Sequence, residues 1–189
     1  MADKGRRRLL GVGYAASGYG FGRVFRSLYK NLSDCWEIEH LEFTHPSPGV
    51  LDVPWRVHIT NRPAYHFGHL EFADLLDLRR PDVVLCSLDI WQLTPYLLAA
   101  EQASWRPRLV AYCPIDAPVP SECDLSALAL LDALAVPTNY GAAMVQASLE
   151  KQGVALRLAV EVIPHGVDTE DFHPVDGRMA RLTLFPSEP

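Results

Sequence analysis

The sequence lacks several features that would assign a protein class at once. It has no apolar run approaching about eighteen residues, so we expect no membrane-spanning helix. It has no G-x-x-x-x-G-K-[ST] string, which excludes the phosphate-binding loop of ATPases and GTPases. Its four cysteines form no C-x-x-C pair, and it contains no internal repeat or low-complexity segment. Cys86 and Cys113 fall in apolar runs, so we expect packed thiols and a reducing, cytoplasmic location.

Positive charge is also scarce. The 189 residues carry a net charge of −6, and Arg6–Arg8 is the one basic run, which argues against a nucleic-acid-binding protein. This run precedes the apolar stretch Leu9–Ala16 and imitates a secretion signal. Gly11 and Gly13 interrupt the apolar stretch, however, so a first β-strand explains it better.

A glycine-rich turn follows this first strand. Gly18, Gly20 and Gly22 stand at every second position, and an apolar stripe at helical spacing comes next: Phe21, Val24, Phe25, Leu28 and Leu32. A strand, a glycine-rich turn and a helix together direct backbone N–H groups at one point, which is typical of an anion-binding site. A tight strand-to-helix turn also favours glycine for steric reasons alone, and both interpretations stay open.

Apolar strands and amphipathic helices alternate along the rest of the chain. This pattern predicts an α/β fold with a mostly parallel sheet wound on both faces. Strands are expected at Trp36–Phe43, Val53–Thr60, Asp82–Ile90, Arg108–Pro114, Asp132–Pro137 and Ala159–Ile163. Helices are expected at Leu70–Arg79, Thr94–Ser104 and Leu125–Leu131, and from a cap at Thr138 or Asn139 to Gly153. Ligands of such sheets bind beyond the carboxyl ends of the strands, so the turns after these strands should form one rim.

One segment near the end of the chain resembles a known family. Glu161–Pro174 contains the pattern V-I-x-x-G-V-D-x-x-x-F-x-P, which is similar to the segment that closes the N-terminal domain of family-four glycosyltransferases. The glycine-rich turn stands where that family has its own, and Ala135–Gly141 resembles a strand-to-helix turn late in the same domain. The resemblance spans nearly the whole chain.

The resemblance implies one half of a GT-B fold, in which two Rossmann-like domains face a cleft. In that family the N-terminal domain mostly binds the acceptor, and the C-terminal domain binds the nucleotide sugar and carries an E-x7-E motif. Sugar transfer retains the anomeric configuration and usually needs no metal. The implied contacts to the donor lie in the glycine-rich turn and the closing motif: Gly18, Tyr19, Gly20, Phe21, Gly22, Arg23 and Gly166. Backbone N–H groups there would stabilise the leaving phosphate, and Arg23 would add a cation.

Asp116 and His165 are the catalytic candidates that the resemblance suggests. Asp116 follows a buried strand near the place where the family has a His or Asp that contacts the acceptor hydroxyl. His165 lies in the closing motif and would face the cleft, although each residue could instead only shape a turn. His66 and His69 stand three residues apart, with Glu71 near them, and could be metal ligands, but no third ligand is placed convincingly, so no metal is predicted.

The resemblance implies a glycosyltransferase N-terminal domain at residues 1–175, followed by a linker or frayed tail at 176–189. No E-x7-E-bearing second domain is present in the 189 residues, so the chain resembles a truncated enzyme or one subunit of a split enzyme. We therefore expect an enzyme that is inactive in isolation, with a nucleotide sugar as donor, no tightly bound cofactor and a possible complementary C-terminal domain. The face toward that partner should expose apolar side chains: Phe21, Ile115, Val119, Leu182, Leu184 and Phe185.

Two other functions stay open at this stage. A dinucleotide-binding oxidoreductase would need an acidic residue for the ribose, and Glu39 lies at roughly the expected distance past Gly18. A non-catalytic binding module with the same fold is the other alternative.

Overall fold

The computed structural model describes residues 6–15, 20–42, 53–59, 68–156, 159–170 and 172–185. Seven strands form one sheet in the order β3-β2-β1-β4-β5-β6-β7, and every neighbouring pair is parallel. The strands are β1 (Arg7–Gly13), β2 (Trp36–Glu42), β3 (Arg56–Ile59), β4 (Val83–Ser87), β5 (Arg108–Tyr112), β6 (Ala133–Val136) and β7 (Val160–Val162). The predicted parallel α/β sheet is thus confirmed.

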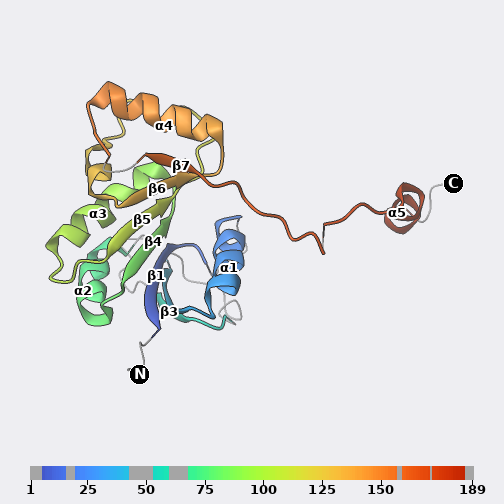
Figure 1. The fold of residues 1–189 in the computed structure, drawn as a ribbon, viewed down its shortest axis with the longest axis horizontal. Coiled ribbons are helices and arrows are strands. Elements are labelled where there is room, and N and C mark those ends of the chain that lie inside the picture. Colours follow the sequence, from blue (N-terminus) through green and yellow to red (C-terminus); the bar gives the residue numbers. More distant parts are fainter. Residues whose placement is uncertain are drawn as a thin grey trace.

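Helices lie on both faces of this sheet (Figure 1). Helix α1 covers one face near β1, whereas α2, α3 and α4 lie on the other face. The helical segments are α1 (Gly20–Leu32), α2 (His69–Arg79), η1 (Ile90–Gln92), α3 (Leu93–Gln102), η2 (Ser126–Leu130), α4 (Asn139–Gln152) and α5 (Gly177–Leu184). The helix expected at Leu125–Leu131 is instead the 3-10 helix η2, because the chain turns directly from it into β6. None of the helices in the described ranges is long and apolar enough to cross a membrane.

The boundaries of α4 follow from its capping residues. The Thr138 hydroxyl accepts a hydrogen bond from the Gly141 N–H at 3.0 Å, which satisfies one of the unpaired donors at the helix start. Gly153 ends the helix with φ 66°, a conformation that glycine adopts without strain. The sequence predicted both ends correctly.

Two hydrophobic cores form, one on each side of the sheet. The larger core joins β1, β4, β5 and β6 to α2, α3 and α4, and its fully buried members include Leu10, Phe72, Leu97 and Leu128. It also encloses Cys86, whose pKa burial raises to about 12, so this thiol is a packed, unreactive group as expected. The smaller core lies under α1 and is built around Leu9, Ala15, Phe25 and Tyr29.

Two glycines of β1 allow α1 to approach the sheet closely. A Cβ at Gly11 would lie 1.5 Å from the Tyr29 hydroxyl, so this position cannot hold a side chain while Tyr29 is in place. Gly13 ends β1 with φ +148°, and a Cβ there would meet the Ser87 carbonyl at 2.7 Å. The glycines inside β1 are therefore required by packing, and a ligand is not needed to explain them.

The chain leaves the sheet after β7 in an extended segment that leads to α5 (Figure 1). Asp176 caps α5 by accepting a hydrogen bond from the Met179 N–H at 2.9 Å. No residue of α5 is buried. This helix lies in the region that was expected to be a linker or tail, and no pattern in the sequence predicted it.

Candidate functional site

The candidate site is a cleft that opens at the carboxyl edge of the sheet and continues along the face of the sheet beside α1. The strand order reverses direction between β1 and β4, and a crevice is expected where two neighbouring connections leave in opposite directions. The cleft consists of two adjoining hollows of about 750 Å³ and 510 Å³. Gly20, Val24, Tyr112 and His165 line both hollows and mark their common boundary.

Helix α1 supplies one wall of the cleft, and its first turn faces the opening. Gly20 begins the helix, Phe21 lines the larger hollow and exposed Arg23 lines the smaller one. The helix N-terminus adds a partial positive charge to that of Arg23. Gly22 is buried within α1 and lines neither hollow, while Gly18 and Tyr19 lie outside the described residues.

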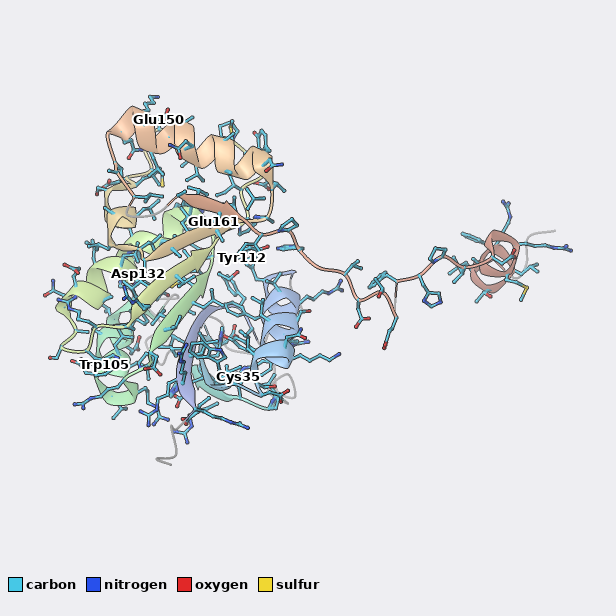
Figure 2. All side chains as sticks on the ribbon, in the orientation of Figure 1. Cys35, Trp105, Tyr112, Asp132, Glu150 and Glu161 are labelled. Carbon is cyan, nitrogen blue, oxygen red and sulfur yellow. The ribbon has the colours of Figure 1, made fainter. Side chains whose placement is uncertain are left out.

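The segment after β7 supplies the opposite wall. The His165 ring lies 5.5 Å from the Tyr112 ring, centroid to centroid, and Gly166 lines the smaller hollow. The Tyr112 hydroxyl donates a hydrogen bond to the Ile163 carbonyl at 2.8 Å, which ties the end of β5 to this segment. Figure 2 shows Tyr112 between α1 and the chain that leaves β7. The sequence therefore correctly predicted that His165, Gly166 and the start of α1 share one edge.

Among the described residues that line the cleft, Asp89 supplies the carboxyl group, and no sequence pattern indicated it. It stands two residues after the end of β4 and lines the larger hollow, whereas Asp116 is exposed and lines neither hollow. Burial first, and the nearby charge of Asp116 second, raise the pKa of Asp89 above its usual value. The backbone N–H of Asp89 donates to the Gln92 side chain at 3.2 Å, which fixes the turn after β4. Asp116 therefore affects the cleft only through its charge, which helps to raise the pKa of Asp89.

Tyr14 and Ser87 also line the larger hollow and were not identified from the sequence. Tyr14 directly follows β1, and Ser87 is the last residue of β4. The rule that ligands lie at the carboxyl ends of parallel strands could have found both, because each stands at such an end beside the reversal of strand order.

Glu39 does not lie at this edge. It stands in the middle of β2, where its carboxylate accepts hydrogen bonds from Arg79 Nε at 2.8 Å and pairs with His58 Nε2 at 2.5 Å. Burial alone would raise its pKa, but hydrogen bonds from Arg79 and His58 and the charges of these groups outweigh burial and lower it. Glu39 is committed to this ion pair and is not placed to bind a ribose.

The described part of the chain holds no group of three or more His, Cys, Asp or Glu residues positioned for a metal ion. His69 and Glu71 both lie in α2, and His66 is outside the described residues.

The fold is similar to those of several solved structures, whereas comparisons of the sequence alone found no match. No family model matches it, and no curated protein matches it significantly either. HepE from Anabaena in complex with UDP and glucose superposes with a TM-score of 0.64 at 15% identity, over 95% of this chain and 50% of that chain. The same protein in complex with UDP gives a TM-score of 0.62 at 15% identity, over 94% of this chain and 50% of the other.

Two further neighbours agree. OtsA in its apo form gives a TM-score of 0.55 at 14% identity, over 95% of this chain and 55% of that chain. A Listeria monocytogenes protein provisionally assigned as a UDP-N-acetylglucosamine 2-epimerase gives a TM-score of 0.52 at 13% identity, over 82% of this chain and 44% of that chain. The chain thus spans about half the length of these structures. The expected Rossmann-like α/β fold, matching GT-B neighbours, is confirmed.

Proposed function

We propose that this chain is the acceptor-binding, N-terminal half of a retaining, nucleotide-sugar-dependent glycosyltransferase. One observation carries the proposal: the cleft lies at the carboxyl edge of a sheet whose solved neighbours include a GT-B protein in complex with UDP and glucose. The resemblance of Glu161–Pro174 to the closing motif of family-four enzymes supports it independently.

The residues of the cleft suggest a division of roles. The first turn of α1 and the Arg23 guanidinium would stabilise negative charge on the leaving phosphate of a sugar donor. His165 and Gly166 would contact the donor sugar or acceptor from the opposite wall. The Asp89 carboxylate, with Asp116 beside it, would accept a hydrogen bond from the acceptor hydroxyl and orient it for attack.

In this proposal the groups that bind the nucleotide sugar come from a second Rossmann-like domain that faces the cleft. That domain would belong to a longer chain or to a partner subunit, and the site would act in the cytoplasm without a tightly bound cofactor or a metal. The 189-residue chain alone is then expected to transfer no sugar, since half of the catalytic site is contributed by the other domain.

The test is sugar transfer by the chain assembled with a second domain. The chain is co-expressed with a candidate Rossmann-like second domain and supplied with UDP-glucose, other nucleotide sugars and a panel of sugar and lipid acceptors. We expect a glycosylated product with retained configuration, and a loss of kcat of about tenfold or more in Arg23→Ala, which is about 1.4 kcal/mol of transition-state stabilisation.

Other outcomes would contradict the proposal. Interconversion of UDP-sugars without an acceptor product would indicate an epimerase. Binding without turnover of any donor would indicate a binding module. Turnover of a nucleotide sugar by the purified 189-residue chain alone would disprove the half-site arrangement.

The oxidoreductase alternative has its own direct test. A ligand that binds only the folded state raises the melting temperature, so an NAD-binding protein would be stabilised by millimolar NAD or NADP. We expect no shift with either dinucleotide, because Glu39 is held by Arg79 and His58 away from the cleft. A clear shift would favour the oxidoreductase over the transferase.

A further inference from the structure

The two peptide groups that flank Tyr14 are both held by side chains of β2. The Gly13 carbonyl accepts a hydrogen bond from His40 Nε2 at 3.1 Å, and the Ala15 N–H donates to Glu42 Oε2 at 2.8 Å. The His40 and Glu42 side chains are completely buried. Because the peptide planes before and after Tyr14 are both fixed, the direction of its side chain is set by β2.

The protonation state of His40 follows from its partners. Burial lowers the pKa of His40 to about 3, so the ring is neutral at ordinary pH. The Gly13 carbonyl can only accept, which places the proton on Nε2 and leaves Nδ1 as an acceptor. The Tyr29 hydroxyl donates to that Nδ1 at 2.7 Å, and burial raises the pKa of Tyr29 so that it keeps its proton.

A continuous buried chain of hydrogen bonds therefore runs from α1 through β2 to the end of β1. Every donor and acceptor in it has one consistent role, which makes the arrangement specific as well as stable. Gly11 is part of the same arrangement, because only a residue without Cβ leaves room for the Tyr29 hydroxyl beside the His40 ring.

Tyr14 is aimed by this arrangement into the larger hollow. Its ring lies 5.9 Å from that of Phe21, centroid to centroid, at an interplanar angle of 41°, and both line the hollow. We call Tyr14 and Phe21 the aromatic wall. Ser87 and Asp89 line the same hollow with a hydroxyl and a carboxyl group.

The charge of the lining restricts the ligand. No lysine or arginine lines the larger hollow within the described ranges, and Asp89 and Asp116 make its surroundings acidic. An anionic group placed beside Asp89 would be repelled by its charge, and a purely apolar ligand would make no hydrogen bond to its carboxylate. A neutral ring with an apolar face and hydroxyls along its edge satisfies both the aromatic wall and the polar groups.

We propose that the aromatic wall binds one face of a neutral saccharide ring, that Asp89 accepts a hydrogen bond from a hydroxyl of that ring, and that His40 and Glu42 are positioning residues for Tyr14. This inference deepens the proposed function, on which it rests, by giving the acceptor of this cleft a chemical class.

The test is saccharide binding by the 189-residue chain. Binding is measured from the changes in amide chemical shifts during NMR titrations. The probes are glucose, galactose, mannose, N-acetylglucosamine and maltose, each up to about 50 mM since weak binding is expected. Gluconate and glucose 6-phosphate are the anionic controls. We expect at least one neutral saccharide to shift the Tyr14, Phe21 and Asp89 signals, and both anions to bind more weakly.

Variants then assign the roles. Tyr14→Ala is expected to weaken binding about tenfold, whereas Tyr14→Phe, which keeps the ring, changes it less than about threefold. Tyr140→Ala removes an exposed aromatic ring of α4 outside both hollows and serves as the matched control. Asp89→Asn is expected to weaken the binding of neutral saccharides. It should also reduce the difference in affinity between the neutral saccharides and the anionic controls.

The positioning role has a separate readout. His40→Ala is expected to weaken saccharide binding about as much as Tyr14→Ala and to speed hydrogen exchange at the Ala15 amide more than at α4 amides. His40→Gln, which offers one donor and one acceptor, should restore part of both effects. A uniform rise in exchange with no rescue by glutamine would mean that His40 is only structural.

Failure of this inference is distinguishable from failure of the proposed function. Absence of binding by every neutral saccharide, or equal binding by wild type and Tyr14→Ala, overturns the aromatic wall. Saccharide binding that depends on Tyr14 in a protein whose assembled form transfers no sugar overturns the transferase and leaves the aromatic wall intact.

Discussion

The Tyr112 hydroxyl donates a hydrogen bond to the Ile163 carbonyl at 2.8 Å and so joins the end of β5 to the chain that carries His165. Tyr112 is buried to all but 8% of its surface, while Ile163 is 55% exposed. A buried side chain thus anchors an otherwise exposed wall of the cleft.

Tyr112→Phe keeps the ring and removes this anchor. We expect a loss of about 1 kcal/mol in the free energy of unfolding, the usual net value of a hydrogen bond, measured by urea denaturation. Hydrogen exchange at His165 and Gly166 should rise further than at the core strands. Tyr140→Phe removes the hydroxyl of an exposed tyrosine and should leave both unchanged. Equal effects in the two variants would show that the anchor contributes nothing.

The Glu39 ion pair makes the stability of the fold dependent on pH. The folded-state pKa of Glu39 lies below its unfolded value of 4.5, so its contribution is complete above pH 4.5 and disappears as the pH falls through the folded-state pKa. Glu39→Gln should lower the free energy of unfolding by about 2 kcal/mol at neutral pH, a value between those of exposed and fully buried ion pairs. It should also reduce the loss of stability between neutral and acidic pH.

Glu37 provides a matched control on the same strand. It pairs with Arg8 at 3.6 Å, with more than half of both side chains exposed. Glu37→Gln should therefore change neither the stability at neutral pH nor the acid limb. A comparable loss in both variants would contradict the special role of Glu39.

Gly11→Ala tests the close approach of α1 to the sheet. The added methyl would overlap the Tyr29 hydroxyl, so Tyr29 or β1 must move, and we expect a loss of about 2 kcal/mol or more in thermal or urea unfolding. Gly20→Ala adds the same methyl at the start of α1, where no atom lies within 4 Å, and should not destabilise the fold. Unchanged stability in Gly11→Ala would refute the packing described for Tyr29.

The exposed apolar side chains of α5 predict self-association of the isolated chain. Leu182 is 50% exposed and Leu184 71% exposed, and apolar surface of this kind promotes association. Leu182→Glu combined with Leu184→Glu should reduce association in light scattering without lowering the melting temperature, because α5 buries no residue. Ala143→Glu combined with Ala147→Glu adds equal charge to the exposed side of α4 and should leave association unchanged.

If the chain is monomeric at high concentration before any substitution, this surface needs no partner, and a self-contained binding module becomes the better description. Among the apolar residues expected at the surface, Ile115 is buried, with 7% of its surface exposed. It packs in the larger core and is not part of the associating surface.

Local patterns in the sequence predicted most of the fold. Apolar runs located the strands, and Thr138 and Gly153 gave the ends of α4, because strand burial and helix capping depend on neighbouring residues. The 3-10 geometry of η2 and the helix α5 were missed, since a few residues of tight turn and a short exposed helix leave little periodicity to detect.

The candidate site was predicted in part for a related reason. The closing motif and the glycine-rich turn indicated His165, Gly166, Gly20, Phe21 and Arg23, which lie on one cleft. Asp89 could be found only from the reversal of strand order between β1 and β4. The rule on carboxyl strand ends locates Tyr14, but the orientation of its side chain depends on hydrogen bonds that the flanking peptide groups make with His40 and Glu42, each spanning 27 residues, which no local pattern records.

The hydrogen bonds that hold Tyr14 have a consequence for the order in which the chain is made. Their partners all lie between Gly13 and Glu42, within one strand–helix–strand unit, whereas His165 follows the last strand of the sheet. Domains emerge from the ribosome N-terminal end first, and contacts between residues close in sequence form fastest. The wall that carries Tyr14 can thus assemble during synthesis, long before the residues that face it across the cleft have been translated.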